Sequence, residues 1–237
     1  MQTHLRTLSL GLALSLGLGQ LSAQNGVFKE NFATDGMTLK TIGRGDCHVK
    51  NGVFSSRESY ALFGNPEWKN YSVTFRARAP KGSEQVQIWA GFRAHNRNDR
   101  YIVGLKGGLQ DDIVLARQGY MGTDEFFAVK PLGFHPIPGE WYKFKIDVVG
   151  DRIRVYIYDE NTPRIDVTDK NSNLAPSGQV SLGGGWLTTE FDDLEIKELP
   201  ENYFQGIKRQ EYKYAMSPAE KEAKRQRERS QYKAIEV

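Results

Sequence analysis

The sequence contains a single cysteine, Cys47, among 237 residues. An intramolecular disulfide is therefore excluded, and the folded part must be held together by burial of apolar side chains, which its length allows. A lone thiol can act as a nucleophile, but no base is recognisable near Cys47 in the sequence, which favours a packing role. Histidine is also scarce. His48, His95 and His135 are too scattered for a zinc site, and no Ser-His-Asp order stands out.

Long hydrophobic runs are absent as well. The apolar run at residues 8–18 is too short to span a membrane. It follows the basic Arg6 and precedes small residues at 21–23, and this pattern predicts a secretory signal peptide over residues 1–23. No cysteine follows the run, so a lipoprotein anchor is not expected. We therefore expect a secreted or periplasmic protein with no membrane span.

Charge of one sign is lacking too, because 32 Lys and Arg face 29 Asp and Glu. The small basic excess lies in residues 200–237, so residues 25–199 give no case for nucleic acid as a partner. Composition changes at Pro200, and a capping box at residues 217–220 predicts a charged helix over residues 220–233. This segment is either a solvated linker or a basic arm that contacts acidic glycans, a cell surface or a partner subunit.

No convincing helical pattern precedes Pro200. Roughly a dozen short segments alternate apolar and polar residues, with turn residues about every ten positions. Asn51-Gly52, the commonest hairpin dipeptide, is one such turn. The sequence predicts an all-β antiparallel sandwich, a jelly roll, as one domain over residues 25–199.

Residues 86–118 organise the chain as three consecutive antiparallel strands. In the first strand, Ile88, Ala90 and Phe92 form the predicted core face, and Trp89, Arg93 and His95 form the other. An aromatic plane beside charged donors is typical of a carbohydrate-binding face, although such residues can also simply cover a sheet. Arg76 and Arg78 would favour an acidic glycan if they share that face. The predicted ligand-binding residues are Trp89, Arg93, His95, Tyr101, Arg117 and Trp186, the last on a glycine-rich turn.

The final strand carries the candidate catalytic residues Glu190, Asp192 and Glu195. A glycosidase of the laminarinase type alternates such carboxylates on one strand, and a bulge after Asp192 would be needed for the three to share a face. The same stretch also fits a closing strand that packs Phe191 and Leu194 or Ile196 inside. A second interpretation is a structural calcium site, since first and last strands often pair and calcium prefers several oxygen ligands. Its candidate ligands are Glu30, Asn31, Asp192 and Asp193.

Seven short segments occur in a characteristic order over about residues 27–199. They are Trp68-Lys69-Asn70-Tyr71, Gly91-Phe92-Arg93, Arg100-Tyr101, Leu115-Ala116-Arg117, Gly139-Glu140-Trp141-Tyr142, Gly178-Gln179-Val180-Ser181-Leu182 and Phe191-Asp192-Asp193-Leu194-Glu195-Ile196. Together these segments resemble the concanavalin A-like lectin/glucanase superfamily. Within it, the chain is similar to laminin-G-like modules and to the 3-keto-disaccharide hydrolase domains, also called family-16-like glycoside hydrolases. Departures from the hydrolase pattern lie after Leu182 and at Asp192-Asp193.

Three function classes remain open. The first is an exported carbohydrate-binding module for a poly- or oligosaccharide. The second is a glycoside hydrolase acting on similar ligands, and the third is a non-catalytic interaction module with a tail that contacts a partner or surface. An enzyme would need two close carboxylates in a cleft, whereas an interaction module predicts no cleft.

Overall fold

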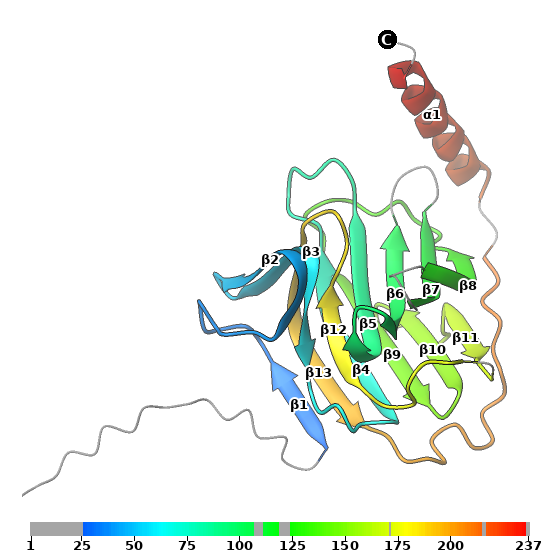
Figure 1. The fold of residues 1–237 in the computed structure, drawn as a ribbon. Coiled ribbons are helices and arrows are strands. Elements are labelled where there is room, and N and C mark those ends of the chain that lie inside the picture. Colours follow the sequence, from blue (N-terminus) through cyan, green and yellow to red (C-terminus); the bar gives the residue numbers. More distant parts are fainter. Residues whose placement is uncertain (1–25, 107–110, 119–123, 171, 215–216, 236–237) are drawn as a thin grey trace, which may run out of the picture.

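A computed structural model of the protein describes residues 26–106, 111–118, 124–170, 172–214 and 217–235. The predicted signal peptide lies outside these described residues. Within them the chain forms thirteen strands followed by one helix (Figure 1). The elements are β1 Val27–Glu30, β2 Thr41–Lys50, β3 Val53–Phe63, β4 Tyr71–Arg78, β5 Gln87–Asn96, β6 Asp99–Lys106, β7 Asp112–Gln118, β8 Asp124–Pro131, β9 Tyr142–Val149, β10 Arg152–Ile157, β11 Ile165–Thr168, β12 Gln179–Gly183, β13 Thr189–Glu198 and α1 Pro218–Ile235.

All strand pairs are antiparallel, and they form one folded-over sheet. Its order is β11-β10-β9-β4-β13-β3-β12-β5-β6-β7-β8, with β1 added to β13 and β2 added to β3. The two ends of this path, β8 and β11, come into contact, so the sheet encloses the core as a sandwich. One core cluster joins Phe92 and Leu115 of one layer to Phe75 and Phe144 of the other. The predicted antiparallel β-sandwich with a C-terminal charged helix is confirmed.

Local sequence signals explain the strands and their turns. Asn51 and Gly52 both have positive φ, 55° and 74°, as the tight turn between β2 and β3 requires. The alternation in β4 follows the pleat of a strand with one buried face. Buried on that strand are Tyr71, Val73, Phe75 and Ala77, and half-exposed are Ser72, Thr74, Arg76 and Arg78.

Cys47, Trp68 and Trp141 have packing roles. Cys47 is half-buried against the core, and burial raises the pKa of its thiol to about 11. Trp68 is buried in the core cluster. Trp141 lies instead on the other side of its sheet, where the guanidinium of Arg78 stacks 4.3 Å from the ring centroid.

The segment after β13, residues 199–214, is named the strap because it runs along the outside of β9, β10 and β11 (Figure 1). Arg154 of β10 donates hydrogen bonds to the buried Asp166 carboxylate and to the carbonyl of Lys208. Phe204 packs against the guanidinium groups of Arg152 and Arg154. The strap is thus anchored to the sandwich through charged side chains of β10 and β11.

No helix in the described part of the chain is long and apolar enough to cross a membrane.

Candidate functional site

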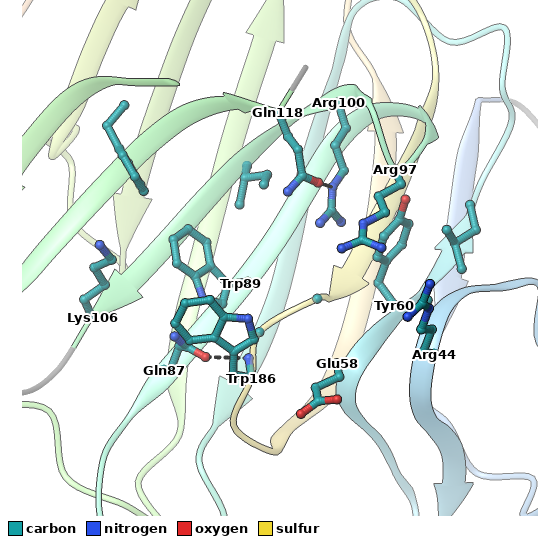
Figure 2. Close-up of a pocket in the computed structure, with 16 residues that line it drawn as sticks. Arg44, Glu58, Tyr60, Gln87, Trp89, Arg97, Arg100, Lys106, Gln118 and Trp186 are labelled. Carbon is teal, nitrogen blue, oxygen red and sulfur yellow. Dashed lines mark hydrogen bonds between the residues drawn. The ribbon is translucent and has the colours of Figure 1, made fainter. Parts of the chain in front are cut away.

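A cleft of about 880 Å³ lies over the solvent side of β2, β3, β5 and β6, the last residue of β7 and the start of β8, beside the glycine-rich turn that follows β12. Aromatic rings, amides and charged groups from seven separate stretches of sequence meet there (Figure 2). Its lining residues are Ile42, Gly43, Arg44, Glu58, Tyr60, Gln87, Trp89, Arg97, Arg100, Ile102, Lys106, Gln118, Phe126, Gly184, Gly185 and Trp186. These residues define the cleft.

Trp89 forms the floor of the cleft, and the neighbouring strand β6 has a glycine where the Trp89 ring packs. In the β5–β6 ladder Trp89 faces Gly104, where an added Cβ would lie 2.5 Å from the indole. Only glycine at this position therefore lets the ring lie flat on β6. Lys106 and Phe126 complete this end of the cleft, with the Lys106 ammonium 4.6 Å from the Phe126 ring centroid.

Trp186 forms an exposed wall beside the floor. It is 76% exposed, and its backbone N–H donates to Gln87 Oε1 at 2.8 Å. The preceding Gly183 and Gly184 have φ of 102° and 103°, a conformation that side-chain-bearing residues rarely adopt. The glycines thus project the indole beside the cleft, where Figure 2 shows it next to Trp89. Trp89 and Trp186 are the two predicted ligand-binding residues that the structure brings together.

The opposite end of the cleft holds a fixed cation that the sequence analysis missed. The Arg100 guanidinium stacks 3.8 Å from the Tyr60 ring centroid and donates hydrogen bonds to Gln118 Oε1 and Ser181 Oγ. Both Arg100 and Tyr60 are almost fully buried. The register that pairs Trp89 with Gly104 places even-numbered residues of β6 on the cleft side. Alternation within β6 was therefore a usable signal for Arg100 once that register was known.

Arg93 was predicted to share the face of Trp89. It does not, because β5 has a bulge after Phe92. Arg93 has a φ of 48°, which ends the simple alternation of the strand. Its guanidinium turns to the end of the sandwich and donates to the carbonyls of Lys69 and Gly150 at 2.9 and 2.7 Å. Burial lowers the pKa of Arg93, and these carbonyls satisfy the buried donors.

Three further predicted ligand-binding residues also lie outside the cleft. Tyr101 points to the core side of β6, and its hydroxyl donates to Asp169 Oδ2 at 2.8 Å. Burial raises the pKa of Tyr101 to about 12. Arg117 forms an ion pair with the same Asp169 carboxylate. His95 lies within the irregular stretch of β5 between Phe92 and Asn96, where its Nε2 is 2.8 Å from the carbonyl oxygen of Ser177.

The candidate catalytic carboxylates lie on the outer face, defined here as the outward side chains of β4, β9, β10 and β13. The predicted bulge between Asp192 and Glu195 is present, with Asp193 at a φ of 51°, and it turns all three carboxylates outward. Each is paired with a cation, and Arg76 and Arg78 also stack on Trp141 rather than facing the cleft. The pairs are Arg78–Glu190 at 2.6 Å, Arg76–Asp192 at 2.8 Å and Lys29–Glu195 at 3.0 Å.

The four residues considered for calcium do not fit such a site. The Glu30 carboxylate accepts the backbone N–H of Phe32, and Asn31 accepts that of Ala33. Asp192 and Asp193 both pair with the Arg76 guanidinium, which holds positive charge where a calcium ion would need free oxygens. Across the described ranges, no group of three or more His, Cys, Asp or Glu side chains is arranged to hold a metal ion.

Comparisons with known proteins show similarity in structure but not in sequence. No protein-family model matches the chain, and no curated protein matches its sequence. The carbohydrate-binding module CBM66 from Bacillus subtilis superposes with a TM-score of 0.51 at 16% identity, over 74% of this chain and 98% of that one. A prokaryotic β-1,3-1,4-glucanase (lichenase) from a mouse hindgut metagenome gives 0.53 at 11% identity, over 73% and 99%. The exoplasmic/lumenal domain of VIP36, in its Ca²⁺/Man-bound form, gives 0.50 at 12% identity, over 76% and 92%.

These likenesses cover nearly the whole of each compared domain while sharing few identical residues. They therefore establish the fold. They do not establish an activity, because one fold hosts many functions and the sequence identities are low. The chain therefore has a jelly-roll β-sandwich fold like that of these three domains.

Proposed function

We propose that the protein is an exported carbohydrate-binding module that holds a poly- or oligosaccharide in the cleft. The observation that carries the proposal is Trp186, an indole that is 76% exposed on a glycine turn and lies beside a second indole. Exposed aromatic planes stack on the apolar faces of sugar rings, and polar side chains that line the cleft, such as Gln87, can form hydrogen bonds with hydroxyls. The predicted signal peptide supports export to the periplasm or outside the cell.

The carboxylates favour a binding module over a glycoside hydrolase. Retaining and inverting glycosidases use two carboxyl groups about 5 to 9.5 Å apart across the scissile bond. Among the described residues that line the cleft, Glu58 is the one carboxylate. Glu190, Asp192 and Glu195 lie on the outer face, in the other layer of the sandwich, and each pairs with a cation. Hydrolysis of a 3-keto-disaccharide or a glucan is thus the second candidate function.

A pure interaction module is the third candidate, and the cleft argues against it. That class predicts a surface without a cleft and a helix with an apolar face. The charged helix α1 has few apolar residues, and mean hydropathy along it is low. Its role as a partner-binding arm stays a prediction.

Binding to an array of polysaccharides, followed by a reducing-end assay on each ligand found, tests the proposal. We expect binding without new reducing ends. Trp186→Ala should weaken binding by about 30-fold, since loss of one stacked aromatic contact costs about 2 kcal/mol. Trp141→Ala, which removes the tryptophan of the outer face, is the matched control and should leave affinity unchanged.

Two results would contradict the module. New reducing ends would make the protein a hydrolase and direct attention to Glu58. Binding to no polysaccharide, by a chain with a normal melting transition, would leave the interaction module as the remaining candidate.

A further inference from the structure

The charged groups of the cleft are unequal in number. Among its described lining residues, four are cations and one is a carboxylate, Glu58. The cations come from two separate strands, β2 and β6, and from the turn between β5 and β6, so folding brings them together rather than a local basic run. They are Arg44, Arg97, Arg100 and Lys106.

The two arginines nearest Tyr60 differ in mobility. Arg100 is 2% exposed and is held by Gln118, Ser181 and the Tyr60 ring. Arg97 is exposed on the turn between β5 and β6, and forms no ion pair with any described residue. Figure 2 shows both guanidinium groups on the Tyr60 side of the cleft. One cation is therefore fixed in place, and the other can move to meet a ligand.

The Tyr60 hydroxyl lies beside these guanidinium groups as a polar atom without a partner. It is buried, and no described residue forms a hydrogen bond with it. The Arg100 guanidinium lies 3.8 Å from the centroid of the Tyr60 ring, and Figure 2 shows Arg97 on the same side of the cleft. Burial raises the pKa of Tyr60, and the positive charges of Arg100 and Arg97 oppose that rise. A buried donor without an acceptor is costly, so an oxyanion that enters beside Arg97 would satisfy it.

We propose that the cleft is specific for an anionic saccharide, whose carboxylate or sulfate group binds between Arg97 and Arg100 and accepts a hydrogen bond from the Tyr60 hydroxyl. Guanidinium groups pair with planar or tetrahedral oxyanions through two parallel N–H donors, which neutral hydroxyls do not match. Trp186 would hold the sugar ring at the other end of the cleft. This inference rests on the proposed carbohydrate binding and specifies its ligand class.

Calorimetric titration of the protein with three hexasaccharides tests the inference: a uronate oligomer, a sulfated galactan oligomer and a neutral glucan oligomer. We expect at least one anionic ligand to bind more tightly than the neutral one, and the arm that binds identifies the anion as carboxylate or sulfate. Arg97→Gln should weaken that binding about tenfold, since a hydrogen bond to a charged group is lost. Tyr60→Phe, which keeps the stacked ring, should weaken it by a smaller factor.

Controls separate this site from general attraction to a basic surface. Lys197→Gln removes an exposed cation from β13, in the other layer of the sandwich, and should leave the affinity for the anionic oligosaccharide unchanged. Tighter binding of the neutral glucan, or equal loss for Arg97→Gln and Lys197→Gln, would overturn the anionic specificity while the carbohydrate-binding function stands. Absence of binding to all three ligands would overturn both.

Discussion

The outer face and the cleft treat their charged side chains in opposite ways. On the outer face Arg76, Arg78 and Arg154 each contact a carboxylate from a neighbouring strand. In the cleft, four cations face a single carboxylate among the described lining residues. Charges that pair within the protein stabilise the fold, whereas an excess of one sign is available to a ligand. An arginine in the sequence of a β-sheet protein therefore indicates a binding site only when no carboxylate on a neighbouring strand pairs with it.

Removal of a buried pairing partner on the outer face should have the largest effect. Arg154 is 6% exposed in its side chain, and its guanidinium donates twice to the fully buried Asp166 carboxylate. Arg154→Met should lower the free energy of unfolding by about 3 kcal/mol, because it leaves a buried charge with one fewer partner. Urea unfolding measures this. Arg97→Met in the cleft is the control and should stay within about 0.5 kcal/mol of the wild type; similar losses in both variants would erase the contrast between the faces.

Packing rather than charge should hold the floor of the cleft. Gly104→Val places methyl groups where an added Cβ already meets the Trp89 ring at 2.5 Å and Val114 Cγ2 at 2.9 Å. We expect a loss of about 2 kcal/mol in unfolding free energy from overpacking, together with weaker glycan binding. In a double-mutant cycle, Trp89→Leu should recover about 1 kcal/mol of that loss, since the smaller side chain frees the space. Strictly additive effects of the two substitutions would contradict the proposed contact.

Acid should weaken the outer face before the cleft. Burial alone would raise the pKa of Asp166, but hydrogen bonds from Arg152, the Gln210 backbone and Arg154 outweigh it and hold the pKa below its usual value. Because the folded-state pKa is depressed, the stabilisation is complete above the usual aspartate pKa of about 4 and is lost as the pH falls through the folded value. Urea unfolding at decreasing pH should therefore show a steeper loss for the wild type than for Asp166→Asn. Parallel curves would assign the acid sensitivity to other groups.

The smallest effect is expected at the rim of the outer face. The side chains of Lys29 and Glu195 are 69% and 41% exposed, so solvent and salt screen their ion pair. Lys29→Gln should change the unfolding free energy by about 0.5 kcal/mol or less. A loss approaching that of Arg154→Met would show that position on the outer face, rather than burial, sets the value of a charge pair. Lys197→Gln on the same sheet serves as the control.

Much of the fold could be predicted from the sequence, because strands and turns depend on local signals. Alternation in β4 and the Asn51-Gly52 turn needed no knowledge of distant residues. The binding residues depended on more than one strand. Arg93 left its expected face through a bulge, and Tyr101 took the core side because the β5–β6 register pairs Trp89 with Gly104. Neither feature is encoded in the alternation of a single strand.

The cleft itself was only half predictable for the same reason. Trp89 was predicted from the alternation of its strand and Trp186 from the three glycines that precede it, and both line the cleft. Tyr60 and Arg100 stack on one another from strands separated by β12 and β5 in the sheet, so no short motif contains them. The strap also escaped prediction, since its anchors are guanidinium groups that donate to backbone carbonyls and leave no periodic pattern.

The meeting of β8 and β11 has a further consequence for behaviour in concentrated solution. A strand at the margin of a sheet exposes unpaired N–H and C=O groups, which recruit strands from other molecules and start aggregation. Here the two ends of the long strand path approach one another, and the strap lies along β10 and β11. Two further strands, β1 and β2, have one partner each. β1 is only four residues long, and β2 has an interrupted register after Gly43 and carries the charged Arg44, Asp46 and Lys50. The protein should therefore resist strand-to-strand polymerisation, a useful property for a chain predicted to work outside the reach of cytoplasmic chaperones.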